Sequence, residues 1–544
     1  MKPLLLAILL LLSLGAHAQP TAWTFTFPID DVNGVMDVAT GSDGNIYVTG
    51  RFTGSLHLGN RLLTSTGAGP CLYIAKCSPG GQVLRVTKME GADDVLPRSI
   101  VVDEAGNSYV TGAFRGTLTY NGNQHITAQS FQGQNDDAFL LKCGPAGRVR
   151  WVSQADGGPA SATNSCFGVA VAVDGQGNSY ITGGASGDNI RFGRFSFGPR
   201  RYQGFVASYD QQGQVRWVRV WDGLGQGFGV SVGQGVVVDK TGNCYVSGNS
   251  LRGWTLDGID LLSPKNTTFL AKFNTRQGLL LWSKSTPGED DGRAIAIDKL
   301  GDVCLGGSFT GTATFGSITL TSAGSSDGFV ARYDPNGDID WATALGGPDY
   351  DVVTALAVDQ KSRKVFATGL MNFTPQGTNQ SFLQQLNTNG RLQHLELVGG
   401  PGTSSSDKIA IDNRNNIYSA GVFTGKCRFG SLTRNTEVTH SYFARYGNRL
   451  PNRDEDEDDP RTQQVVSLFP NPAQQQFTLR VVNGERAGKA TLYNEMGMRV
   501  ATHVLQAAPA AEVGFDTSAL PDGLYVLRLE SQGAHTTHLV KVQH

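Results

Sequence analysis

The stretch Asn107-Ser-Tyr-Val-Thr-Gly112 recurs along the chain and decides the fold. The other copies are Asn45 to Gly50, Asn178 to Gly183, Asn243 to Gly248, Asp302 to Gly307, Lys364 to Gly369 and Asn416 to Gly421. They stand roughly sixty residues apart, a spacing typical of proteins built from one repeated supersecondary unit. The sequence therefore predicts seven copies of one unit.

Each unit contains four short apolar stretches separated by turn signals. An apolar run such as Val169 to Val173 ends in Asp174, and a turn of the Asp-x-x-Gly-Asn kind leads to the second stretch. A longer connection precedes the third stretch, such as Phe205 to Tyr209, which alternates like a strand with one packed face. Another Asp-x-x-Gly turn opens the fourth stretch, which often carries Trp. Helical periodicity is absent, so we expect an all-β protein.

The two ends of the repeat region complement each other. The last unit reaches a third strand at Tyr442 to Tyr446 and has no fourth strand after it. Before the first unit, Ala22-Trp-Thr-Phe-Thr-Phe27 resembles fourth strands such as Arg150-Trp-Val-Ser153. A ring closed by pairing these two ends explains both facts, whereas an open β-solenoid explains neither. We therefore predict a seven-bladed β-propeller with four-stranded blades, in which the N-terminal strand closes the last blade.

The repeats resemble the bacterial seven-bladed β-propeller repeat family, whose units share a Val-Asp-x-x-Gly-Asn-x-Tyr-Val-Thr-Gly core. The resemblance covers residues 22–447. The poorest match is the sixth unit, which has Lys364-Val-Phe-Ala-Thr-Gly369 at the core and His394 in place of Trp. The first unit has Arg85 at that place. This family is defined by repeat and fold, and the resemblance implies no single activity.

The first residues are typical of a secretory signal peptide. Lys2 precedes an apolar stretch from Leu4 to Leu14, and Ala16-His17-Ala18 supplies a cleavage site. The apolar stretch is too short to span a bilayer as a helix, which needs ~20 residues. We expect residues 1–18 to direct export to the periplasm, residues 19–448 to form the propeller, and no segment to span a membrane.

An acidic linker, residues 449–464, follows the repeats. Its run Asp454 to Asp459 repels itself and should stay extended. A calcium loop is disfavoured, because Asp459 and Val465 stand where an EF-hand requires Gly and Glu.

The last region, residues 465–544, is predicted to form a small β-sandwich. It resembles the C-terminal sorting domain of the Bacteroidetes type IX secretion system. The residues that carry the resemblance include Phe469, Pro470, Asn471, Pro472, Gly523, Leu524, Tyr525 and Lys541. The resemblance implies that the chain engages the type IX secretion machinery and reaches the extracellular space or the outer cell surface.

Charge and cysteine usage argue against several classes of protein. The formal net charge is −2 and no basic stripe is present, so a nucleic-acid partner is not expected. The seven cysteines form neither a Cys-x-x-Cys pair nor a Cys/His cluster, which argues against a zinc site. Export permits disulfides, but an odd count leaves at least one thiol unpaired. Cys77 and Cys143 take a repeat position held elsewhere by Tyr or Phe, which indicates a small apolar role.

The chain carries no recognisable catalytic motif. Neither a Gly-x-Ser-x-Gly elbow, nor a His-Glu-x-x-His motif, nor a phosphate-binding loop is present, so we predict no catalytic residues and no organic cofactor. The repeated Asp-x-x-Gly-x-x-x-Trp, as in Asp210 to Trp217, is similar to the tryptophan-docking motif of quinoprotein propellers but differs by one residue in spacing. We interpret these tryptophans as packing one blade on the next.

A weaker candidate site is a set of acids in the connections from the fourth strand of one unit to the first strand of the next. These connections and those between second and third strands emerge on one face of a closed ring, and they vary as recognition loops do. The acids are Asp30, Asp31, Asp93, Asp94, Glu289, Asp290, Asp291, Asp349, Asp351 and Asp407. Gathered at a channel mouth they would hold Ca²⁺ or a cationic ligand. The alternative is that each Asp caps its own turn.

These observations favour a secreted or cell-surface protein that binds or adheres to a glycan or to another protein. The alternative is an extracellular carbohydrate-active enzyme, a lyase or glycosidase, on the propeller scaffold. Such an enzyme would need a carboxylate pair or a Tyr/His site that breaks the repeat symmetry near the channel. A passive structural or adhesive component is a third hypothesis.

Overall fold

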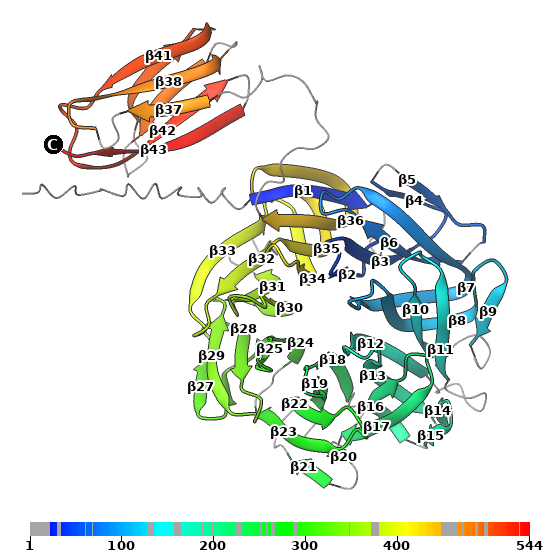
Figure 1. Ribbon diagram of the computed structural model, residues 1–544. Helices are drawn as coiled ribbons and strands as arrows, with labels where there is room; N and C mark the ends of the chain where they lie inside the picture. The colour runs from blue at the N-terminus through cyan, green and yellow to red at the C-terminus, as the bar shows by residue number, and fades with distance from the viewer. Residues whose placement is uncertain are drawn as a thin grey trace, which may run out of the picture. The chain divides into compact units, whose positions relative to one another are not determined.

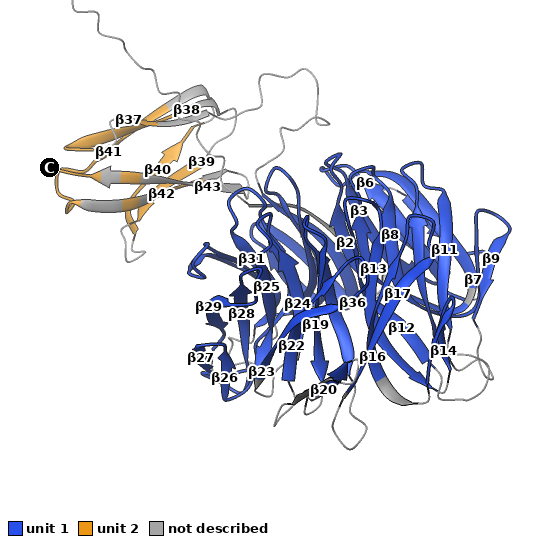
Figure 2. Ribbon diagram, turned by 60° about the horizontal axis from the view of Figure 1, so that its bottom comes forward, with its two compact units in different colours: residues 1–450 blue, residues 451–544 orange. Residues whose placement is uncertain are grey.

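The chain divides into two compact units, Met1–Leu450 and Pro451–His544 (Figure 2). The computed structural model describes residues 22–29, 34–59, 61–67, 69–128, 135–156, 165–187, 189–198, 200–223, 231–250, 253–256, 259–262, 267–287, 291–347, 349–371, 380–447, 465–469, 473–484, 488–493, 499–506, 508–531 and 534–544. Every regular element in these ranges is a β-strand, as the sequence predicts. Within them, no helix is suited to cross a membrane. The predicted signal peptide and linker lie outside them.

The strands of the first unit fall into groups of four antiparallel strands, each called a sheet here and named by its first strand, and shared strands and hairpins join some groups into larger sheets. The β2 sheet contains β2 (Asp37–Thr40), β3 (Ile46–Phe52), β6 (Cys71–Cys77) and the start of β7 (Val83–Val102). The β7 sheet contains the end of β7, β8 (Ser108–Tyr120), β10 (Asp137–Cys143) and β11 (Val149–Asp156). The β12 sheet contains β12 (Ser165–Val173), β13 (Ser179–Gly187), β16 (Arg200–Tyr209) and β17 (Val215–Gly223).

The pattern continues to the end of the unit. The β18 sheet contains β18 (Val232–Val238), β19 (Asn243–Ser250), β22 (Thr267–Asn274) and β23 (Leu280–Pro287). The β24 sheet contains β24 (Asp291–Ile297), β25 (Val303–Phe309), β28 (Asp327–Tyr333) and β29 (Ile339–Leu345). The β30 sheet contains β30 (Val352–Val358), β31 (Val365–Met371), β32 (Gln380–Leu386) and β33 (Leu392–Gly399). The β34 sheet contains β34 (Thr403–Ile411), β35 (Ile417–Phe429), β36 (Leu432–Gly447) and β1 (Ala22–Ile29).

These sheets stand around a common centre with their first strands innermost (Figure 1). Each inner strand contacts that of the next sheet, and β2 contacts β34, so the first and last sheets are neighbours. Strand β1 pairs antiparallel with β36, with Phe27 opposite Phe443. The pairing of the N-terminal strand with the stretch around Phe443 is therefore confirmed.

The register of β1 corrects the sequence alignment by two residues. Trp23 lies opposite Tyr446 and Phe25 opposite Arg445, with a bulge between them. In the β7 sheet, Val149 and Trp151 take these two places around the same bulge. The equivalent of Trp151 is therefore Phe25. The error arose because aromatic residues stand at both positions and the letters fit either register.

A repeated hydrogen-bond arrangement explains the Asp-x-x-Gly-Asn-x-Tyr pattern. The carboxylate of Asp174 accepts the backbone N–H groups of Gln176 and Asn178 through Oδ1, at 2.9 Å each. Its Oδ2 accepts the Asn178 side-chain amide and the Tyr180 hydroxyl, also at 2.9 Å. We call this the Asp–Asn–Tyr clasp, and its Asn and Tyr bonds recur at Asp103, Asp239 and Asp412. These residues hold the turn between the first two strands, so their pattern reflects structure and not ligand binding.

The Thr-Gly pair that ends the repeated phrase packs the second strand. Thr182 donates its hydroxyl to the Phe205 carbonyl at 2.6 Å. A Cβ at Gly183 would collide with the backbone carbonyl of Phe167 on the inner strand. Only glycine allows this close approach of the two backbones.

The tryptophans of the fourth strands dock on the next sheet. Trp217 Nε1 donates to the Thr275 carbonyl at 2.9 Å, and its ring lies against Gly278 in the turn between β22 and β23. Equivalent bonds to the next turn are made by Trp151, Trp282 and Trp341. This confirms the interpretation of these tryptophans as packing between sheets.

The connections between second and third strands form β-hairpins wherever the structure describes a separate pair of strands. The hairpins are β4 (Ser55–Leu58) with β5 (Arg61–Thr64), β14 (Ile190–Phe192) with β15 (Phe195–Phe197), β20 (Gly253–Leu256) with β21 (Ile259–Leu262), and β26 (Thr312–Phe315) with β27 (Ile318–Thr321). Strand β9 (Gln124–Thr127) pairs with the extended β8 in the same way. Because β14 pairs with β11 and β20 pairs with β17, the β14–β15 and β20–β21 hairpins each extend the preceding sheet. The described connections are therefore largely strands, and their role in recognition stays a prediction.

All seven cysteines are described, buried and unpaired. Burial raises the pKa of the Cys77 thiol to about 12. Cys77 packs in a cluster with Ile46 and Val83. The predicted apolar role of Cys77 is therefore confirmed.

The second unit consists of two antiparallel sheets. One contains β37 (Val465–Phe469), β38 (Gln476–Gly484) and β41 (Ala508–Asp516). The other contains β40 (Arg499–Leu505), β39 (Gly488–Tyr493), β42 (Gly523–Ser531) and β43 (Ala534–Val542). One hydrophobic cluster joins Phe477 and Leu479 of the first sheet to Leu492 and Leu527 of the second, so the sheets share a core.

Candidate functional site

The acids predicted to surround one channel mouth have no common setting in the described structure. Asp30, Asp31, Glu289 and Asp290 lie outside the described residues, and Asp291 is placed only as the first residue of β24. Asp93 and Asp94 lie within β7, which joins two sheets without a loop. In the described ranges, no three His, Cys, Asp or Glu residues are grouped as metal ligands. A calcium site that involves the acids outside the described residues stays a prediction.

The acids of the connection after β29 serve the backbone. Asp351 is buried, and its Oδ2 accepts the Gly347 N–H at 2.7 Å. Its own N–H donates to the Ser326 carbonyl at 2.8 Å, while the Asp349 carbonyl accepts the Ser326 N–H at 3.3 Å. The Asp349 side chain is exposed. Asp351 thus follows the alternative in which an acid caps its own turn.

A cluster of three arginines and two aspartates lies where the β2, β7 and β12 sheets meet. Arg51 contacts Asp94 at 2.5 Å, and Arg115 contacts Asp94 at 3.4 Å and Asp136 at 2.6 Å. The third arginine is Arg98, whose pKa is lowered by burial and raised by the negative charge of Asp136. The side chains of Arg115 and Asp136 are each 34% exposed, so solvent reaches the cluster. We call this set the arginine cluster.

Arg98 occupies a β-bulge of the inner strand. Pro97 pairs with Gly112 and Ser99 with Thr111, which leaves Arg98 as the extra residue. Its guanidinium carbon lies 5.2 Å from the centre of the Phe167 ring. Its Nε is buried without a hydrogen-bond partner, and burial lowers its pKa while the charge of Asp136 raises it. Arg98 is therefore a cation whose desolvation the described residues offset only in part.

The same bulge recurs in the inner strands of five other sheets, those that begin with β12, β18, β24, β30 and β34. The extra residues, here called the bulge residues, are Arg98, Val169, Gln234, Arg293, Thr354 and Asp407. The backbone geometry repeats, but side-chain charge and size do not. This is where a symmetric ring presents asymmetric chemistry, and bulges often aim side chains at functional sites. The signal in the sequence was one position at the start of the apolar run that varies from unit to unit and is polar in most of them.

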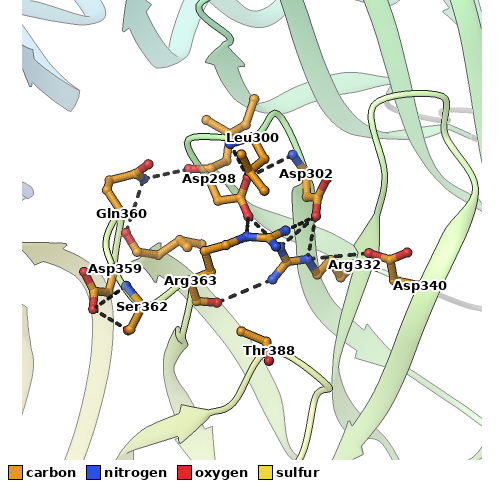
Figure 3. A network of polar contacts seen from close by, with 12 residues as sticks. Asp298, Leu300, Asp302, Arg332, Asp340, Asp359, Gln360, Ser362, Arg363 and Thr388 are labelled. Atoms are coloured by element: carbon orange, nitrogen blue, oxygen red, sulfur yellow. Dashed lines mark hydrogen bonds and ion pairs between the residues drawn. The ribbon is translucent and has the colours of Figure 1, made fainter.

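A second charged cluster is buried and balanced in charge (Figure 3). Arg332 contacts Asp298 at 2.5 Å and Asp302 at 2.7 Å, and Arg363 contacts Asp298 at 2.6 Å and also pairs with Asp302. The side chains of Arg332 and Asp298 are 2% and 1% exposed. Burial alone would raise the pKa of Asp298, but its bonds to Arg363 and to the backbone hold it below its usual value.

This network replaces the clasp in the β24 sheet. Asp302 stands where the clasp has Asn, and Cys304 where it has Tyr. Buried Arg332 and partly exposed Arg363 face Asp298 and Asp302, and the more exposed Asp340 also contacts Arg332. The network holds no spare positive charge for a ligand. We assign it to the packing of the β24 sheet against the β30 sheet.

The predicted sorting residues are described unevenly. Tyr525 is buried, and its hydroxyl donates to the Pro521 carbonyl at 2.9 Å. Leu524 lies opposite Lys541 in the ladder between β42 and β43. Phe469 and Gly523 are placed only as the last residue of β37 and the first residue of β42. Pro470, Asn471 and Pro472 lie outside the described residues.

Residues 467–543 match the family described as the secretion system C-terminal sorting domain. This tail marks the protein as secreted or cell-surface and implies engagement with the type IX secretion machinery. A curated relative, the uncharacterized WD repeat-containing protein L264 of Acanthamoeba polyphaga mimivirus, is 23% identical over 502 residues. That match covers 72% of this chain and 35% of the relative, so the chain spans about a third of the relative's length.

Solved structures similar to the chain include a sialidase and a glycoside hydrolase. NanB sialidase from Streptococcus pneumoniae is 10% identical with a TM-score of 0.35, over 77% of this chain and 68% of that chain. A glycoside hydrolase of family 32 from Bifidobacterium adolescentis is 9% identical with a TM-score of 0.25, over 96% of each chain. TM-scores this low transfer no activity to the protein.

Proposed function

We propose that this protein is a secreted or cell-surface binding protein, for a glycan or protein ligand, built on a seven-bladed β-propeller. Its C-terminal β-sandwich serves sorting by the type IX machinery of a Bacteroidetes cell. The four-stranded sheets and the pairing of β1 with β36 support this architecture. In this view each sheet is one blade, and the inner strands line a channel.

The observation that carries the binding role is the contrast between repeated backbone and varied side chains at the bulge residues. A purely structural ring has no need of Arg98, Gln234, Arg293 and Asp407 at one equivalent position. Polar groups that converge on a channel mouth supply the few directional contacts that binding sites need. The arginine cluster, to which Arg98 belongs, adds further half-buried charges.

The chemistry of the arginine cluster favours binding over catalysis. Asp94 and Asp136 each contact an arginine, so neither faces a ligand as an unpaired proton donor. A lyase or glycosidase would need a carboxylate pair, or a Tyr/His site, directed at the scissile bond. We therefore propose ligand binding without turnover, and without a required metal or organic cofactor.

Residues 19–544 should be tested on a glycan array together with turnover assays. The assays would follow new reducing ends and unsaturated products on a panel of acidic and neutral polysaccharides. We expect retention of at least one glycan class without product formation. A variant with Arg98, Gln234 and Arg293 changed to Ala should lose this retention. Product formation, or retention that the triple variant leaves unchanged, would overturn the proposed function.

A further inference from the structure

We propose that Arg98, beside the ion pair of Arg115 with Asp136, forms a subsite for the carboxylate group of an acidic glycan. This inference rests on the proposed binding function and names its ligand class. The shared chemistry is a planar, singly charged oxyanion attached to a ring that bears hydroxyl groups. A uronic acid residue in a polysaccharide has this chemistry.

The charges of the arginine cluster leave one cation in excess. Arg51 and Arg115 are held in ion pairs with Asp94 and Asp136. Arg98 makes no ion pair with a described carboxylate, and its buried Nε has no hydrogen-bond partner. A cation that is partly desolvated without a counter-ion is costly, so a ligand oxyanion that reaches the partly exposed Arg98 side chain gains a charge-assisted hydrogen bond to the guanidinium.

Phe167 positions this cation. The Arg98 guanidinium lies over the Phe167 ring, and the Cζ end of that ring packs so closely on Gly184 that a Cβ there would collide with it. A guanidinium held on an aromatic face keeps its in-plane N–H groups for a planar acceptor. Arg98 is therefore oriented before a ligand arrives, which lowers the cost of binding.

The other bulge residues set Arg98 apart. Val169, Gln234 and Thr354 carry no charge. Arg293 is the second bulge cation, and its charge stabilises the ionised form of Asp407, the bulge anion. The surrounding protein raises the pKa of Asp407, although part of this side chain is exposed, and the charges of Lys408 and Arg293 oppose that rise. No bulge residue supplies an anion beside Arg98, so the excess charge on its side of the ring remains for a ligand.

The two aspartates favour a sugar over an acidic peptide. Their side chains are 38% and 34% exposed, so the oxygen atoms of Asp94 and Asp136 border the subsite. Sugar hydroxyl groups donate well to such acceptors, whereas a run of Asp or Glu side chains brings no hydroxyl group to them. A single excess cation also suits one carboxylate better than a dianionic phosphate.

The test compares polygalacturonate with its fully methyl-esterified form, which lacks the charge but keeps the chain. Residues 19–544 should bind the acid form, and rising salt should weaken this binding. The R98Q variant should lose about tenfold to a hundredfold in affinity, since a charge-assisted hydrogen bond contributes about 1.5–3 kcal/mol. R98K keeps the charge but not the planar fork of the guanidinium, so its affinity should lie between those of the unchanged protein and R98Q.

R148Q is the matched control, because Arg148 is exposed in the turn between β10 and β11 and the change in charge is the same. It should bind as the unchanged protein does. Equal binding of acid and ester, or unchanged affinity of folded R98Q and R98K, overturns the subsite. Binding to neutral glycans alone overturns the subsite and leaves the proposed function standing. Retention of poly-glutamate but not polygalacturonate, if lost in R98Q, overturns the glycan assignment in favour of an acidic protein.

Discussion

Two neighbouring junctions of the ring are built differently. Between the β24 and β30 sheets, Trp341 donates to the Thr388 carbonyl at 2.9 Å and packs on Gly390 in the turn between β32 and β33. Between the β30 and β34 sheets, His394 stands in place of Trp, and its Nε2 lies 2.7 Å from the Tyr446 hydroxyl. No turn joins the third and fourth strands of the β34 sheet, because β36 and β1 come from different ends of the repeat region. A tryptophan at the second junction would have no turn to dock on.

This difference explains why the sixth unit departs from the repeat. The outer strand β33 keeps Leu392, Leu395 and Leu397 at 49%, 37% and 40% exposure. The fourth strands β11, β17 and β29 are less exposed along their lengths. His394 is therefore an adaptation to the point of ring closure. It is not a sign of a degraded repeat.

The first junction also contains the buried network, and removing one of its cations should have the largest effect. The R332M change leaves Asp298 and Asp302 with only Arg363, so an uncompensated charge stays buried. We expect the free energy of unfolding to fall by about 3–5 kcal/mol. Urea unfolding followed by tryptophan fluorescence measures this, because all seven tryptophans lie in the first unit.

R148M provides the control for R332M, since it makes the same change at an exposed arginine, in the turn between β10 and β11. Its effect should stay within about 0.5 kcal/mol. If the free energy of unfolding of R332M falls by less than about 1 kcal/mol, the network does not stabilise the packing of the β24 sheet on the β30 sheet.

The tryptophan contact should have an intermediate effect. W341F removes the indole N–H bond to Thr388 and part of the area packed on Gly390, which should cost about 1–3 kcal/mol. H394F at the closing junction removes the contacts of Nε2 with Tyr446 and Glu396 and no turn contact, and should cost about 0.5–1.5 kcal/mol. Thermal unfolding of the two variants side by side checks the order. Equal losses would show that the missing turn does not matter.

Much of this architecture could be predicted from the sequence, because each repeated letter has a local role. Asp174, Asn178 and Tyr180 form a clasp within a few residues of chain, and Gly183 marks a close approach of two backbones. Ring closure followed from a missing strand at one end and an extra strand at the other. The register of β1 did not follow, because Trp23 and Phe25 both suit an aromatic position.

The candidate site was harder to predict, because it depends on a one-residue offset and on long-range contacts. Arg98 stands in a bulge, where it leaves the alternation that a strand pattern predicts. Its neighbours Asp136 and Phe167 are distant in sequence. The acids were assigned to loops, but β7 continues through Asp93 and Asp94 as one strand. Only the pairing of strands could reveal either fact.

The smallest predicted effect is the loss of the Tyr446 hydroxyl, which is compared with the loss of the clasp hydroxyl of Tyr180. Y446F removes the hydroxyl that contacts His394 but keeps the ring, whose centroid lies 5.5 Å from that of Trp23. A neutral hydrogen bond contributes about 0.5–1.5 kcal/mol, and we expect a loss in that range. Y180F removes a hydroxyl that donates to the Asp174 carboxylate, a charged acceptor, and should cost about 1.5–3 kcal/mol. Urea unfolding of both variants gives the comparison directly. If Y446F costs more than Y180F, ring closure depends on the His394 contact more than the clasp depends on its tyrosine, and the closing junction is not the weaker one.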